Sequence, residues 1–94
     1  MSWIVSYSKK AAKQYGSLPP VVQDRLDALA AEIELLGPVR SNWKNYSKLE
    51  GRTRQHHCHI KTGRPTYVAV WEETDETVKL VEVVYAGTHE KAHY

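Results

Sequence analysis

Residues 53–85 read TRQHHCHIKTGRPTYVAVWEETDETVKLVEVVY, and this stretch decides the fold. It contains three runs rich in β-forming residues, Thr53 to Lys61, Thr66 to Glu73 and Val78 to Tyr85. The segments that separate these runs, Thr62 to Pro65 and Thr74 to Thr77, are short and contain turn-forming residues. Because short connections join antiparallel neighbours, the stretch predicts three consecutive antiparallel strands.

The residues near the N-terminus predict a further strand followed by a short helix. Trp3 to Tyr7 is rich in β-forming residues and is expected to form a strand. Ser8 is a suitable N-cap for a helix from Lys9 to Tyr15, which ends at Gly16, a common helix terminator.

A longer amphipathic helix is predicted from Val21 to Leu36, where apolar residues recur at helical spacing until Gly37 and Pro38 end the pattern. Asn42 to Arg52 has no clear period, so we expect a loop or a short turn there. The order is strand, helix, helix and three strands. We therefore predict an α+β fold, a mainly antiparallel sheet with a two-helix hairpin on one face.

The composition fits one folded domain over residues 1–94. The chain has 94 residues, of which 41% are hydrophobic and 26% charged, as in an ordinary globular protein. No apolar run approaches the roughly 18 residues needed to cross a bilayer, and the N-terminus lacks the pattern of a secretory signal. We expect a cytoplasmic protein without membrane contact, and Cys58 is expected to be buried rather than reactive.

The charges are distributed unevenly along the chain. Residues 41–67 have a net charge of +5, whereas residues 68–94 have a net charge of −4. A basic block of this kind attracts a polyanion through long-range electrostatics and counterion release. The alternative is a solvated surface with its counter-charges close in space, and charge alone does not separate the two interpretations.

All the histidines lie in the C-terminal half, at His56, His57, His59, His89 and His93. In a strand from Thr53 to Lys61, the two-residue period places His57, His59 and Lys61 on one face. Cys58 and Ile60 then point to the other face, which is the better candidate for the core. His56 shares that second face, so the sequence predicts that it lies outside the histidine row.

Several segments together resemble the RelE/ParE toxin superfamily, and more closely its RelE and HigB types. The segments that carry the likeness are Leu49-Glu50-Gly51, the strand His57 to Lys61, Gly63 to Trp71, Val84 to Lys91 and the closing Tyr94. The likeness covers nearly the whole chain. It implies a RelE-like fold and the toxin of a toxin–antitoxin pair, a messenger-RNA endonuclease that acts on the ribosome and is held inactive by a cognate antitoxin protein. It implies no cofactor.

The resemblance also implies site residues. Where the RelE type has two lysines on the second strand, this chain has His57 and His59. Where that type has an arginine after the last strand, this chain has His89. The C-terminal tyrosine of the family corresponds to Tyr94, which follows His93 as in some relatives.

One position departs from the family pattern. The arginine that the RelE type carries at the start of the third strand aligns with Thr66. Lys61 or Arg64 would then have to hold the phosphate in its place. A glutamate base that one branch of the family uses also has no evident counterpart in this chain.

These residue types suit metal-free RNA cleavage, in which the 2′-hydroxyl attacks the adjacent phosphate. Histidine can serve as base or acid near neutral pH. The sequence leaves open whether His57 or His59 is the base, and whether His89 or His93 is the acid. Tyr94 is expected to stack on a base or to join the proton relay. The basic residues expected to bind phosphate or RNA are Lys48, Arg54, Lys61, Arg64 and Lys91.

Other functions remain open on the sequence alone. His57, His59, His89 and His93 could supply nitrogen ligands to zinc, but the neighbouring cations would repel the ion, so we expect no metal. A ParE-like toxin on the same fold would poison DNA gyrase without cutting RNA, and a non-catalytic interaction module is a third reading. Paired proton carriers favour the nuclease.

The aromatic residues divide into core and possible RNA contacts. Tyr67 and Trp71 share one strand face and are expected to pack in the core. Trp43 and Tyr46 lie inside the basic block and are the aromatic residues expected to contact RNA.

Overall fold

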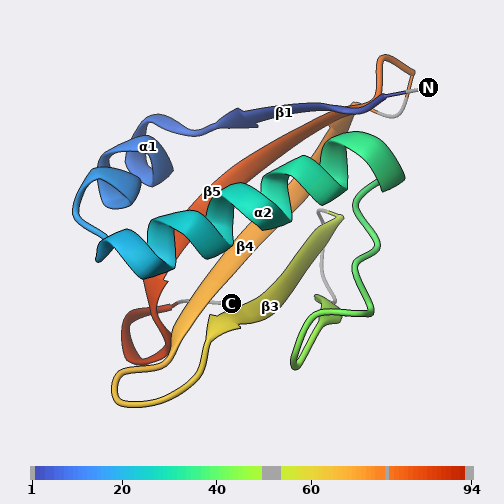
Figure 1. Cartoon of the computed structure of the whole chain (residues 1–94). Coiled ribbons are helices and arrows are strands. Elements are labelled where there is room, and N and C mark those ends of the chain that lie inside the picture. The colour runs from blue at the N-terminus through green and yellow to red at the C-terminus, as the bar shows by residue number, and fades with distance from the viewer. Residues whose placement is uncertain (1, 50–53, 76, 93–94) are drawn as a thin grey trace.

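The computed structural model describes residues 2–49, 54–75 and 77–92. Its elements are β1 (Ile4–Tyr7), α1 (Lys9–Gly16), α2 (Pro20–Leu36), β2 (Ser47–Leu49), β3 (Gln55–Lys61), β4 (Tyr67–Asp75), β5 (Leu80–Thr88) and the 3₁₀ helix η1 (His89–Lys91). Within the described residues the strands form one five-stranded sheet in the order β1-β5-β4-β3-β2. The long helix α2 crosses one face of this sheet, as Figure 1 shows. The predicted α+β class is confirmed.

The three central strands pair as the sequence predicts. β3 is antiparallel to β4, and β4 is antiparallel to β5. β5 begins two residues later than predicted and continues past Tyr85 to Thr88. The first strand, β1, pairs with β5 in parallel, with Ile4 beside Leu80 and Tyr7 beside Val83. This parallel pair makes the sheet mainly, rather than wholly, antiparallel.

The prediction of a loop from residue 42 to residue 52 is partly wrong, because β2 lies within it. Ser47 to Leu49 pairs antiparallel with β3, and Ser47 lies opposite His57. Three residues are too few to show a two-residue period, so this strand depends on its partner rather than on local pattern. The Leu49-Glu50-Gly51 motif lies partly outside the described residues.

The core lies between α2 and the sheet. Val22, Leu26, Leu29 and Ile33 of α2 are fully buried, as the helical spacing predicts. Burial of a side chain of this size contributes about 1.5–3 kcal/mol each. Cys58 faces the same core, where burial raises the pKa of its thiol to about 12. The thiol is therefore protonated near neutral pH, and the prediction of a buried cysteine is confirmed.

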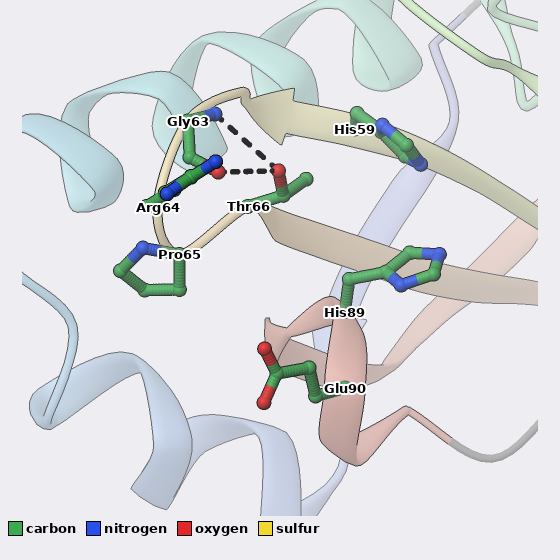
Figure 2. Close-up of a pocket in the computed structure, with 7 residues that line it drawn as sticks. All are labelled: His59, Gly63, Arg64, Pro65, Thr66, His89 and Glu90. Carbon is green, nitrogen blue, oxygen red and sulfur yellow. Dashed lines mark hydrogen bonds between the residues drawn. The ribbon is translucent and has the colours of Figure 1, made fainter.

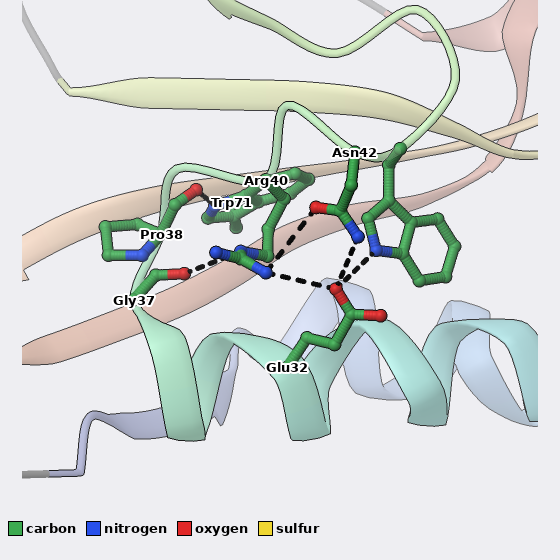
Figure 3. Close-up of polar contacts among 7 residues, drawn as sticks. Glu32, Gly37, Pro38, Arg40, Asn42 and Trp71 are labelled. Carbon is green, nitrogen blue, oxygen red and sulfur yellow. Dashed lines mark hydrogen bonds and ion pairs between the residues drawn. The ribbon is translucent and has the colours of Figure 1, made fainter.

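Glu32 of α2 fastens the segment that follows the helix. Its Oε1 accepts hydrogen bonds from Arg40 Nη1 at 3.1 Å, Asn42 Nδ2 at 2.9 Å and Trp43 Nε1 at 3.0 Å, as Figure 3 shows. The hydrogen bonds from Asn42 and Trp43 are the largest causes of a lowered pKa for this carboxyl. Trp43 thus has a structural role as an anchor of this segment, and its contact with RNA stays a prediction.

His56 forms a second anchor on the buried face of β3. Its Nε2 donates to Glu73 Oε2 at 2.7 Å, and its Nδ1 accepts from the Tyr46 hydroxyl at 2.6 Å, the tautomer that satisfies both partners. The ring stacks on Trp71 with a centroid distance of 5.7 Å. Tyr46 therefore belongs to this network, and its contact with RNA stays a prediction. The prediction that His56 lies outside the histidine row is confirmed.

Candidate functional site

His57 and His59 lie on the face of β3 opposite the buried one. Both are half-buried, whereas their neighbours His56, Cys58 and Ile60 are fully buried. The alternation predicted from the sequence is therefore confirmed for this strand. Val70 pairs with His57 and Val68 with His59 in the register of β4, so these two buried valines lie beside the imidazoles.

The fold brings His89 to His59. β5 runs to Thr88, and the backbone N–H of His89 donates to the carbonyl of Thr66 at 2.8 Å, which continues the pairing with β4 by one residue. The rings of His59 and His89 lie edge to face, with centroids 5.3 Å apart. His57 is the next ring along β3, with its centroid 6.4 Å from that of His59.

The two rings lie beside a hollow of about 540 Å³. Figure 2 shows its lining residues, which come from β3, the β3–β4 turn and η1: His59, Gly63, Arg64, Pro65, Thr66, His89 and Glu90. Arg64 is exposed and supplies a permanent positive charge at the turn. A small hollow with two imidazoles and a guanidinium can hold a phosphate group between proton carriers.

Thr66 stabilises the turn that presents Arg64. Its hydroxyl donates to the Gly63 carbonyl at 2.9 Å, and the Gly63 N–H donates to the same hydroxyl at 3.3 Å. Thr66 therefore has a structural role in the turn. Arg64 and Lys61 are the two residues expected to hold the phosphate. Arg64 lines the hollow, whereas Lys61 is half-buried with its Nζ beside Gly63.

The surroundings lower the pKa of both strand histidines. Burial is the largest cause at His59, followed by the nearby charges of His89, His57 and Lys44. Burial also lowers the pKa of His57, assisted by the charge of His89, although a hydrogen bond with the Ser47 backbone acts in the opposite direction. A lowered pKa keeps an imidazole neutral near pH 7, which is the form that can accept a proton.

Two residues of the site were not found by sequence reasoning. The Lys44 carbonyl accepts a hydrogen bond from the His59 backbone N–H at 2.8 Å, which places Lys44 next to His59. The Ser47 hydroxyl lies 2.9 Å from His57 Nδ1. The only signal for Lys44 was its membership of the basic block, and Ser47 had none because β2 was not predicted.

The remaining predicted site residues are not gathered at the histidine pair. Lys48 lies opposite His56 in the register, on the other face of the sheet from His57 and His59. Arg54 forms an ion pair with Glu73 at 3.7 Å, near the opposite end of β3. Lys91, on η1, lines a separate groove. The two predicted residues His93 and Tyr94 lie outside the described residues.

Two features that bear on the class of protein are absent from the described residues. Across residues 2–49, 54–75 and 77–92, no three side chains of His, Cys, Asp or Glu are grouped as they would be to hold a metal ion. In that same part of the chain, no helix has the length and apolar character required to cross a membrane.

The fold and the site together define a class of protein. It is an α+β protein in which one face of the sheet packs on helices and the other face presents the histidines His57 and His59. No family model matches the sequence, and no curated protein sequence matches it significantly. Solved structures do match. A chain of the archaeal RelE–RelB complex from Pyrococcus horikoshii superposes with a TM-score of 0.76 at 18% identity, over 98% of this chain and 100% of that one.

Two further structures agree. A chain of the intact E. coli RelBE toxin–antitoxin complex has a TM-score of 0.70 at 20% identity, covering 99% of this chain and 100% of its own. A chain of the YoeB dimer from Staphylococcus aureus has a TM-score of 0.71 at 13% identity, covering 100% of this chain and 100% of its own. The chain therefore has the RelE-like fold, as the sequence resemblance implied.

Proposed function

We propose that the protein is the toxin of a toxin–antitoxin pair and cuts messenger RNA without a metal ion. The observation that carries this proposal is the contact between the His59 and His89 rings beside a hollow lined by Arg64. The RelE-like fold supports it, because two of the similar chains come from RelE–RelB complexes. By analogy with those complexes, a cognate antitoxin is the expected protein partner.

The proposed reaction needs only the RNA and side chains of this chain. The neutral His59 ring removes the proton from a 2′-hydroxyl, and the freed oxygen attacks the adjacent phosphorus. The bond from phosphorus to the 5′-oxygen breaks, and His89 gives that oxygen its proton. The products are a 2′,3′-cyclic phosphate and a 5′-hydroxyl end, and no other reactant is consumed.

Arg64 is the cation proposed to stabilise the negative charge that develops on the phosphate oxygens. Its guanidinium is always charged and can donate two parallel hydrogen bonds to one phosphate. The proposed reaction does not need a metal ion, because Arg64 and Lys44 already supply positive charge at the site. These two charges would also oppose the binding of a metal cation. His93 and Tyr94 remain proposed members of the site, as an alternative acid and a stacking or relay group.

The lowered pKa of His59 predicts the pH dependence of cleavage. Because the base must be neutral, kcat/KM is expected to fall on the acid side with a midpoint below the ordinary histidine pKa of about 6.5. At pH 7 more than half of the His59 rings are therefore expected to be neutral and able to accept the proton. The measurement is a kcat/KM profile from pH 5 to about 8 at constant ionic strength.

Lys44→Gln is expected to shift this pH profile in the opposite direction. Lys44 is one of the positive groups that disfavour a proton on His59, so its removal should raise the pKa and move the acid limb to slightly higher pH. An acid limb in the unaltered protein centred above 6.5 would show that His59 is not the base.

The proposed cellular function is tested by inducing the protein and mapping messenger-RNA 5′ ends on translating ribosomes. New 5′ ends inside translated messages, absent when His59 is replaced with alanine, are expected. Intact messages together with DNA breaks linked to gyrase would overturn the proposal in favour of a ParE-like poison. Intact messages without such breaks would point to an interaction module.

A further inference from the structure

A second groove lies on the other side of η1, between α1 and the ends of β4 and β5. Its volume is about 690 Å³, larger than the histidine hollow. Its lining contains three lysines and no acidic residue among those described: Lys10, Lys13, Gln14, Ser17, Leu18, Tyr67, Tyr85, Ala86, Gly87, Thr88 and Lys91. A concave surface with only positive charges attracts an anion.

The lysines of α1 are presented on one side of that helix. Lys10 and Lys13 are three residues apart, so their side chains lie next to each other on the helix surface. Both are exposed. Gln14 follows Lys10 by one helical turn, and its side-chain oxygen accepts a hydrogen bond from the Ala86 backbone N–H at 3.0 Å. This bond fixes the lysine-bearing side of α1 against β5.

The wall of the groove is held in place by Tyr85. Its hydroxyl donates to the Thr88 carbonyl at 2.7 Å, and its ring lies over Gly87, where a side-chain carbon would come within 2.8 Å of that hydroxyl oxygen. Lys10 Nζ lies 5.8 Å from the centre of the same ring. The Lys10 ammonium therefore lies over an aromatic ring in the wall of the groove, and positive groups beside aromatic rings are common where proteins bind single-stranded nucleic acid.

We infer that this groove binds the phosphate backbone of single-stranded RNA through Lys10, Lys13 and Lys91, continuing the path of the strand cut at the His59–His89 pair. The inference rests on the proposed function, because η1 joins the two surfaces. His89 and Glu90 line the histidine hollow, whereas the next residue, Lys91, lines the groove. A strand that leaves the histidines over η1 reaches Lys91 first and then the lysines of α1.

An acidic peptide is the other polyanion to consider, and the continuity with the histidine hollow favours RNA. The groove contacts are proposed to be independent of base identity, since lysine ammonium groups bind phosphate as point charges. The groove would thus hold the message on one side of the cleavage point while the ribosome or the histidine hollow sets its position.

The test compares two variants that remove the same charge. One is Lys10→Gln/Lys13→Gln/Lys91→Gln, and the matched control is Lys9→Gln/Arg25→Gln/Lys79→Gln, whose positions do not line the groove. The probe is a short, fluorescent 2′-O-methyl RNA that cannot be cut, and its Kd is measured by anisotropy between about 50 and 200 mM salt. Circular dichroism checks that each variant is folded.

Loss of three phosphate contacts should reduce the slope of log K against log salt by about 2 and weaken binding roughly tenfold or more at low salt. The control should change the slope much less. Lys10→Arg/Lys13→Arg/Lys91→Arg keeps the charges and should retain the slope of the unaltered protein. Equal slopes for the groove variant and its control would overturn the inference. The inference would also be overturned if the groove variant bound the RNA probe as tightly as the unaltered protein but no longer bound an acidic peptide such as polyglutamate.

The outcome for the groove is separable from that for the proposed function. If the unaltered protein binds the probe through these lysines but cuts no RNA, the groove stands and the nuclease proposal fails. If the protein cuts RNA and the lysine variant binds and cuts as the control does, the groove inference fails and the nuclease proposal stands.

Discussion

Replacing His59 with alanine is expected to lower the single-turnover rate of RNA cleavage by about 10²- to 10⁴-fold, the usual cost of removing a general base. His59 is the strand histidine that contacts His89, and its pKa is lowered by burial and by neighbouring positive groups. The side chain lies outside the core, so the variant should fold. The measurement is the single-turnover rate on ribosomes programmed with a labelled message.

His57→Ala is the matched control on the same strand face. His57 bonds with Ser47, and its ring is next to His59 rather than beside the hollow. We expect a smaller loss of rate than for His59→Ala. If His57→Ala abolished cleavage while His59→Ala cut at the unaltered rate, the assignment of the base would pass to His57.

The second large effect is expected on stability, from His56→Ala. This change removes a ring that contacts the rings of both Tyr46 and Trp71, and it leaves the Glu73 carboxylate, whose side chain is 9% exposed, without its hydrogen bond at 2.7 Å. Removal of one partner of a buried, hydrogen-bonded charge typically costs about 3–5 kcal/mol, and we expect a loss of about 3 kcal/mol. The measurement is the free energy of unfolding from urea titration.

A double variant tests whether the lost hydrogen bond to the Glu73 carboxylate causes this loss of stability. In His56→Leu/Glu73→Leu both polar partners are gone, so the loss of stability should be smaller than the sum of the two single changes. His59→Ala should change the free energy of unfolding by less than about 1 kcal/mol, as expected away from the core. A small effect of His56→Ala, or strict additivity, would show that the buried network contributes little.

The strands and helices of this fold were predictable where a residue pattern repeats. The alternation in residues 55–61 gave both the core face and the histidine face of β3, and the helical spacing gave α2. No local sequence pattern indicates the parallel pairing of β1 with β5. This pairing depends on the position in space at which the chain emerges from the two helices. β2 was missed because its three residues show no period and are placed by contacts with β3 and by the segment that Glu32 anchors.

The site was predictable in part for the same reason. Alternation placed His57 and His59 on one face, but the contact of His59 with His89 depends on β5 extending through Thr88 and on the bond from His89 to Thr66. The sequence pattern ended this strand at Tyr85. The sequence also could not show which basic residues of the block belong to the site. Arg54, for example, is paired with Glu73, which lies far from it in the sequence.

The chemistry of the cut ends tests the central claim most directly. Purified protein is incubated with ribosomes carrying a labelled message, and the ends on both sides of the cut are identified. Attack by the 2′-hydroxyl predicts a 2′,3′-cyclic phosphate and a 5′-hydroxyl, and a single 2′-deoxy substitution at the cut position should abolish cleavage. Ends with a 3′-hydroxyl and a 5′-phosphate, or cleavage that persists at the 2′-deoxy position, would contradict histidine-catalysed, metal-free cleavage by this protein.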